Sequence, residues 1–223
     1  MLLVVIGILI ALQINNWNED RKTNKEEIKI LNELKNDLIT NLSEIIETYN
    51  TTSDRQLSTF LILDYFKELR PVDDSLKKAF ENIKMDGLFN IANTLYKFIE
   101  SQGVNSLSND SLRIRVTEMY ERHLKNILTR ENRTWEMVDD ELIPLMNDRF
   151  LSSPTIDKSV SFAVEVINIP KNIKSLREDS KFKNVIVRLQ NWLLMRLKWQ
   201  EEAHTSIEQL IIDVQEEINK LST

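Results

Sequence analysis

The chain has 223 residues, of which 42% are hydrophobic and 29% charged, with a formal net charge of −6 and no cysteine. These values fit a folded body with a sizeable core, and the lack of cysteine excludes disulfides, thiolate metal sites and cysteine nucleophiles. Acidic and basic residues are interspersed, so no basic field is available for nucleic acid, and we expect no nucleic-acid partner. Only 3 Gly and 4 Pro are present, which predicts an all-α fold with few turns and long helices.

The first predicted element is an apolar helix over residues 1–16. Up to Ile14 the only polar side chain is Gln13, and Trp17 follows at the point where polar residues begin. Such a helix is roughly 21 Å long, whereas a bilayer core requires about 20 apolar residues. We therefore expect the incomplete end of a transmembrane helix that starts further upstream. The side chains expected to contact lipid are Leu2, Leu3, Val4, Val5, Ile6, Ile8, Leu9, Ile10, Leu12 and Trp17.

Two other interpretations of this segment are open. A cleaved signal peptide would have basic residues before the apolar run and small residues at its end, and "LQINNWNEDRK" fits neither requirement. The stronger alternative is a soluble cytosolic bundle in which the first helix is part of the core. The two cases differ in whether the apolar side chains are enclosed by the protein itself.

After Trp17, the charged run "NEDRKTNKEE" leads into an apolar stripe without any Gly or Pro. The spacing by threes and fours predicts one helix that continues to about Thr51. A second helix is predicted from there, ending before Pro71. The first stripe consists of Leu31, Leu34, Leu38, Leu42, Ile45 and Tyr49, and the second of Leu57, Phe60, Leu61 and Leu69.

The middle of the chain predicts shorter helices. Asp73 or Asp74 is the expected N-cap of one that ends before Gly87. The next covers residues 91–102, with Gly103 in the position of a left-handed C-terminal residue.

A long helix is predicted to follow, capped by Asn109 or Asp110 and kinked near its end by Pro144. Its apolar stripe consists of Leu112, Val116, Tyr120, Leu124, Ile127, Val138, Leu142 and Leu145. "LSSPTID" is predicted to be a loop. "VEVINIPKN" has β-branched character, but Pro170 argues against a lasting strand.

The last predicted helix is the longest, with a coiled-coil-like seam. Together the three long stripes predict an antiparallel bundle over residues 17–223, and the last helix is the expected contact with a second copy or another protein. The seam consists of Phe182, Ile186, Leu189, Leu193, Leu197, Gln200, His204, Ile207, Ile211, Val214, Ile218 and Leu221.

Gln200 and His204 interrupt this seam, which predicts a polar core layer that fixes helix register. A polar pocket for a small ligand is the alternative. Glu201 and His204 also have the spacing of a di-metal carboxylate site, but such sites need this motif twice and His123 has Tyr120 in the matching position. We therefore predict no metal, no cofactor and no catalytic residue.

Two segments, "VVIGILIALQINNWNE" and "NTLYKFIESQGVNSLSNDSLRIRVTEMY", resemble an uncharacterised family of bacterial single-pass membrane proteins. The resemblance implies a basic leader, which this sequence lacks, then the apolar helix and a helical domain. A basic leader would keep the N-terminus in the cytoplasm and the body in the periplasm. The expectation is a non-enzymatic inner-membrane protein: a scaffold, a protein-interaction domain or a ligand-sensing ectodomain.

Overall fold

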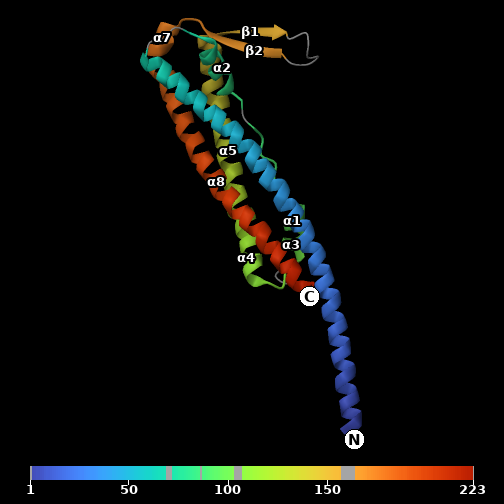
Figure 1. The fold of residues 1–223 in the computed structure, drawn as a ribbon. Helices are drawn as coiled ribbons and strands as arrows, with labels where there is room; N and C mark the ends of the chain where they lie inside the picture. Colours follow the sequence, from blue (N-terminus) through green and yellow to red (C-terminus); the bar gives the residue numbers. More distant parts are fainter. Residues whose placement is uncertain (1, 69–71, 86, 103–106, 157–163, 223) are drawn as a thin grey trace. The chain divides into compact units, whose positions relative to one another are not determined.

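The computed structural model describes residues 2–68, 72–85, 87–102, 107–156 and 164–222, and most of them are helical (Figure 1). The longest helices are α1 (Leu2–Glu68) and α8 (Ser180–Leu221). The chain divides into two compact units. Unit 1 comprises Met1–Ser43, Ile91–Arg122 and His204–Thr223, and unit 2 comprises Glu44–Asn90 and His123–Ala203. The predicted boundary near residue 16 between a membrane segment and a helical body stays a prediction.

In unit 1, parts of α1 and α8 pack with α3 (Thr94–Gln102), α4 (Asp110–Glu118) and the start of the π-helix η1 (Met119–Leu124). Lys35 Nζ on α1 donates to Gln215 Oε1 on α8 over 2.7 Å. Tyr96 of α3 and Tyr120 of η1 stack with their ring centroids 4.4 Å apart. Buried apolar side chains such as Leu34, Leu38 and Leu112 form the core of unit 1.

Polar side chains fix the connections of unit 1. Asn41 is fully buried, and its amide both donates to Ala92 O and accepts from Ala92 N, each over 2.8 Å. Asn109 accepts from Leu112 N over 3.1 Å, which confirms it as the N-cap of α4. The predicted position of Gly103 lies outside the described residues.

Unit 2 contains more elements around its parts of α1 and α8 (Figure 1). They are α2 (Asp74–Asn82), α5 (Lys125–Met137), the π-helix η2 (Val138–Leu142), α6 (Ile143–Arg149), β1 (Phe150–Ile156), β2 (Val164–Pro170) and α7 (Ile173–Glu178). Asp73 accepts from Leu76 N over 2.8 Å and is the N-cap of α2. In unit 2, α8 runs antiparallel to α1, because Thr48 of α1 bonds to Gln200 of α8 while Phe66, further along α1, lies beside Phe182 near the start of α8.

An aromatic cluster forms part of the core of unit 2. Phe66, Phe80, Phe150 and Phe182 are buried, and they come from α1, α2, β1 and α8. The rings of Phe80 and Phe150 meet edge to face, with centroids 4.8 Å apart and planes at 73°. Such pairs contribute about 0.5–1.5 kcal/mol beyond the area that they bury, so the cluster joins four elements distant in sequence.

The antiparallel pair β1–β2 contradicts the prediction of a loop in "LSSPTID" and of no strand in "VEVINIPKN". Phe150 pairs with Pro170 and Ser152 with Asn168. In a two-stranded sheet both strands are edge strands, where a proline without N–H is tolerated. One backbone amide of β2 bonds outside the sheet, because Asn168 N donates to Glu81 Oε1 on α2 over 2.6 Å.

The prediction that the first helix ends near Thr51 is also wrong, because α1 continues to Glu68. The buried stripe does not end: it changes from apolar to polar residues at Thr48, Thr52, Arg55 and Thr59. Leu57 and Phe60, predicted to be core residues, are 58% and 59% exposed. Leu69 and Pro71 lie outside the described residues.

The long helix predicted from Asp110 is present as a succession of α4, η1, α5, η2 and α6. All eight residues of its predicted stripe are buried. Pro144 lies in the first turn of α6, directly after the wide turns of η2. A proline clashes with the carbonyl four residues earlier in a regular α-helix, and a π-helical turn is one of the recognised ways in which a helix accommodates such an interruption.

Candidate functional site

The first candidate site is the apolar arm, residues 3–17 at the start of α1. Its large apolar side chains are exposed all around the helix, from 44% for Ile6 to 84% for Leu3. They are Leu3, Val4, Val5, Ile6, Ile8, Leu9, Ile10, Leu12, Ile14 and Trp17. The apolar arm is thus not part of the core formed by the described residues. The side chain of Leu2, also predicted to contact lipid, lies outside the described residues.

Charged side chains begin directly after the apolar arm. Trp17 is 63% exposed, and the guanidinium of Arg21 lies over its ring at 5.8 Å. Lys22 Nζ is 3.1 Å from Glu19 Oε1. The helix therefore changes within about two turns from a stretch whose only polar side chain is Gln13 to charged residues, with the ring of Trp17 at the change.

Among the residues that the structure describes, no helix is both long enough and apolar enough to cross a membrane.

The second candidate site is a buried polar layer in unit 2, contributed by α1, α5 and α8. Each of its side chains is at most 3% exposed. The layer consists of Thr48, Thr52, Arg55, Thr59, Glu131, Thr134, Arg196 and Gln200. Buried charges are costly unless they are paired and hydrogen-bonded, so their partners decide what the layer does.

The charged members of the layer fix the segment that follows α2. Arg55 Nε donates to Ile83 O over 3.0 Å, at the C-terminus of α2, where a cation is favourable. Glu131 accepts from Phe89 N, with its two oxygens 3.1 and 3.3 Å away. Arg196 forms an ion pair with Glu131 at 3.6 Å. The layer therefore replaces water as the partner of this loop backbone.

The neutral members bond to groups within the bundle, although Oε1 of Gln200 accepts no hydrogen bond from the described residues. Thr48, Thr52 and Thr134 donate to the carbonyl four residues earlier in their own helices, over 2.7–2.8 Å. Gln200 Nε2 donates to Thr48 Oγ1 over 3.1 Å, which joins α8 to α1. Of the two residues predicted for a polar core layer, Gln200 is fully buried, whereas His204 is half-buried and lies 3.4 Å from Glu208.

Neither Glu201 nor His204 forms part of a metal-ligand cluster in the described residues. Glu201 accepts from Tyr49 Oη over 2.8 Å. No group of three or more His, Asp or Glu side chains suitable for a metal ion occurs in the part of the chain that the structure describes.

Asp179 and Glu217, which lie outside the layer, both have lowered pKa values. Burial alone would raise the pKa of Asp179, but the amide of Phe182 and the Arg149 side chain donate to it and keep its pKa below the usual range. Burial likewise opposes ionisation of Glu217, and hydrogen bonds from Asn109 and Lys220 outweigh it, so that its pKa is lowered.

Sequence reasoning missed the buried charges Arg55, Glu131 and Arg196, although a signal for them exists. Glu131 and Thr134 continue the spacing by threes and fours between Ile127 and Val138. Arg196 lies between Leu193 and Gln200 in the same way, and Arg55 between Thr52 and Thr59. A stripe defined by periodicity without regard to polarity would have included them.

Fold and sites together define a mostly helical protein whose long helices α1 and α8 are antiparallel, with an exposed apolar N-terminal arm. Residues 1–192 match the model of a family of unknown function (DUF6090), and the chain belongs to this family. The resemblance to a family without an assigned function is confirmed in this coarser form. Comparisons with curated proteins and with solved structures gave no match.

Proposed function

We propose that this protein is a non-enzymatic helical protein anchored to a lipid bilayer by its apolar arm. The observation that carries the proposal is the exposure of all the large apolar side chains from Leu3 to Ile14. A helix that is apolar on every side requires a non-aqueous environment. Trp17 fits this environment, because its amphipathic ring is typical of the membrane–water interface.

The expected energy of insertion is modest. Leu, Ile and Val each favour insertion by roughly 0.3–0.6 kcal/mol on the biological scale, whereas one Asp at the centre of a helix costs roughly 3 kcal/mol. The nine aliphatic side chains of the arm thus contribute on the order of 4 kcal/mol. Two aspartates cost more than the whole arm gains, which makes the proposal testable by substitution.

The body is proposed to act by binding, as a scaffold, a protein-interaction domain or a ligand-sensing ectodomain. The buried polar layer supports a structural role for the most polar part of the core, since Arg55 and Glu131 bond to loop backbone. A contact of α8 with a second copy or another protein stays part of this proposal.

The second candidate, a soluble cytosolic bundle with the first helix in its core, is less well supported. It requires the apolar arm to be enclosed, and the described residues leave every side chain from Leu3 to Ile6 at least 44% exposed.

A flotation experiment tests the anchor. The full-length chain is mixed with phosphatidylethanolamine–phosphatidylglycerol vesicles and centrifuged through a sucrose gradient. We expect the wild type to float and Ile6→Asp/Ile10→Asp to stay at the bottom. The matched control is Leu57→Asp/Phe60→Asp, which also changes two exposed apolar residues of α1 and should still float. Equal flotation of both double variants would contradict the proposal.

The side of the membrane is a separate part of the proposal. The inner membrane with the body in the periplasm follows from the family resemblance. Protease added to intact spheroplasts should degrade the body, and degradation only after lysis would reverse the proposed orientation.

A further inference from the structure

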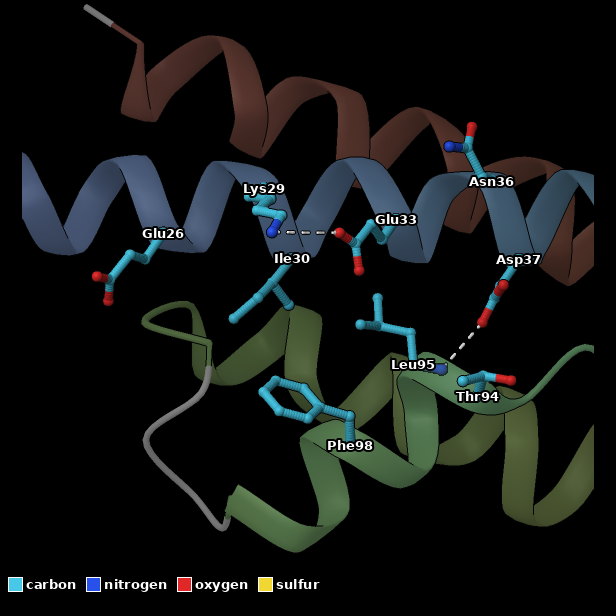
Figure 2. Close-up of a pocket in the computed structure, with 9 residues that line it drawn as sticks. All are labelled: Glu26, Lys29, Ile30, Glu33, Asn36, Asp37, Thr94, Leu95 and Phe98. Atoms are coloured by element: carbon cyan, nitrogen blue, oxygen red, sulfur yellow. Dashed lines mark hydrogen bonds and ion pairs between the residues drawn. The ribbon is translucent and has the colours of Figure 1, made fainter.

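A groove in unit 1 lies between α1 and α3 and has a volume of about 690 Å³. We call it the α1–α3 groove. It is lined by Glu26, Lys29, Ile30, Glu33, Asn36 and Asp37 of α1, and by Thr94, Leu95 and Phe98 of α3. Figure 2 shows Ile30, Leu95 and Phe98 gathered between the two helices, while the charged side chains lie along α1.

The floor of this groove is apolar and incompletely covered. Leu95 is buried, Ile30 is half-buried, and Phe98 is 45% exposed. An aromatic ring in such a position is a suitable anchor for a partner side chain, because aromatic residues dominate the energetics of interfaces.

The rim of the groove carries a net negative charge. Three carboxylates, those of Glu26, Glu33 and Asp37, face one ammonium, Lys29, which is 3.9 Å from Glu33. Asp37 also accepts from Leu95 N over 3.1 Å at the start of α3. The carboxylates exceed the ammonium by two, so the groove attracts cationic partners and repels anionic ones.

The shape restricts the partner further. Glu26 and Asp37 are eleven residues apart on α1, which corresponds to about 16 Å or three helical turns. A helix of similar length fits a groove between two helices by placing side chains at i, i+3, i+4 and i+7 into it. Lys and Arg on its flanks would cover the apolar edges with their stems and reach the carboxylates.

We propose that the α1–α3 groove is the docking site for a basic amphipathic helix of a partner protein. The occupant presents apolar side chains to Ile30, Leu95 and Phe98, and Lys or Arg to the carboxylate rim. This inference concerns unit 1 alone, and it does not depend on insertion of the apolar arm into lipid.

Binding of a synthetic peptide tests this proposal. The probe is a dye-labelled helical peptide with Leu at i, i+3, i+4 and i+7 and Lys at the flanking positions, and its partner probe has Glu in place of Lys. Fluorescence anisotropy is measured with the full-length chain in non-ionic detergent. We expect the Lys peptide to bind at least tenfold more tightly than the Glu peptide, with a preference that decreases from 50 to 300 mM salt.

Substitutions distinguish binding in the groove from a general electrostatic attraction of the Lys peptide to an acidic protein. Phe98→Ala should weaken binding of the Lys peptide about tenfold or more. Glu26→Lys/Glu33→Lys should weaken it several-fold. The matched controls are Ile114→Ala, which removes an exposed apolar side chain of α4, and Glu100→Lys, an exposed charge reversal on α3 outside the groove. Neither control should change binding.

A labelling experiment gives an independent readout. Because the chain has no cysteine, Thr94→Cys creates a single thiol in the lining of the groove. The Lys peptide should slow its reaction with a maleimide, and should not slow that of Ile114→Cys. Equal binding of both peptides, or equal effects of groove and control substitutions, would overturn the proposal, whether or not the chain floats with vesicles.

Discussion

The apolar arm and the buried polar layer depart from the usual distribution of residues in opposite directions. The arm exposes Leu3 to 84% and Leu9 to 57%, whereas the layer buries Arg55 and Arg196 to 1% exposure. The charged side chains of the layer bond to internal partners, such as Ile83 O for Arg55 and Phe89 N for Glu131. The arm has no such partners among the described residues. An exposed apolar residue or a buried charged residue therefore indicates a function only when its partners in the structure are known.

The largest expected effect tests whether the layer depends on its internal partners. Glu131→Ala removes the carboxylate that bonds to Phe89 N and pairs with Arg196. Loss of one partner of a buried pair costs about 3–5 kcal/mol, so urea unfolding of the full-length chain in detergent should show a loss of this size. Glu33→Ala, which removes an exposed carboxylate near Lys29, should change stability by at most about 0.5 kcal/mol. Similar losses in both variants would remove the distinction between buried and exposed pairs.

The next effect compares two leucines of the same helix. Leu38 is fully buried, and Leu38→Ala should lower the free energy of unfolding by about 2–5 kcal/mol. Leu9→Ala should change it by less than about 0.5 kcal/mol, but should weaken vesicle binding several-fold because it removes apolar surface from the arm. If Leu9→Ala destabilised the body as much as Leu38→Ala, the arm would be part of a core.

A smaller effect concerns the neutral part of the layer. Thr48→Val removes the acceptor of Gln200 and leaves a buried amide without this bond, at a cost of about 1–2 kcal/mol. Thr23→Val, which changes an exposed threonine of α1 that bonds to Glu19 O, is the control and should cost much less. The double variant Thr48→Val/Gln200→Leu should lose less than the two single losses combined, because both partners are then apolar.

The smallest effect depends on pH. The pKa of Asp179 is lowered in the folded state, so its ionised form stabilises the fold above the unfolded pKa of about 3.9, and this stabilisation is lost as the pH falls through the folded pKa. Asp179→Asn should cost about 1 kcal/mol at pH 7, and the cost should decrease below about pH 4. In an Arg149→Ala background the substitution should cost less, since the ion pair is already absent. A cost that is constant from pH 7 to pH 2 would contradict this account.

Much of the fold could be predicted from the sequence because its helices are long and strongly periodic. Leu31, Leu34 and Leu38 are buried as predicted, and Asn109 caps α4. The errors have specific causes. The sequence predicts an end of the first helix near Thr51 because the core positions of α1 become polar there. It does not predict β1–β2 because both strands contain proline, which edge strands tolerate. The sequence does not predict the α1–α3 groove, since residues 26–37 on one side and residues 94–98 on the other are far apart in the chain.

The sequence by itself determined the predominance of helix and the apolar character of residues 3–14, and it limited the caps of α2 and α4 to two neighbouring residues each, because these features depend on interactions within a few residues of the chain. Arg55, Glu131 and Arg196 have the spacing of the buried stripes, but only the tertiary structure decided that their charges have partners in the core and that Leu57 and Phe60 are exposed. The physical reason is that a polar side chain is stable in a core only where another segment supplies its partner. Periodicity along one helix contains no information about the backbone groups of Ile83 and Phe89 that bond to Arg55 and Glu131.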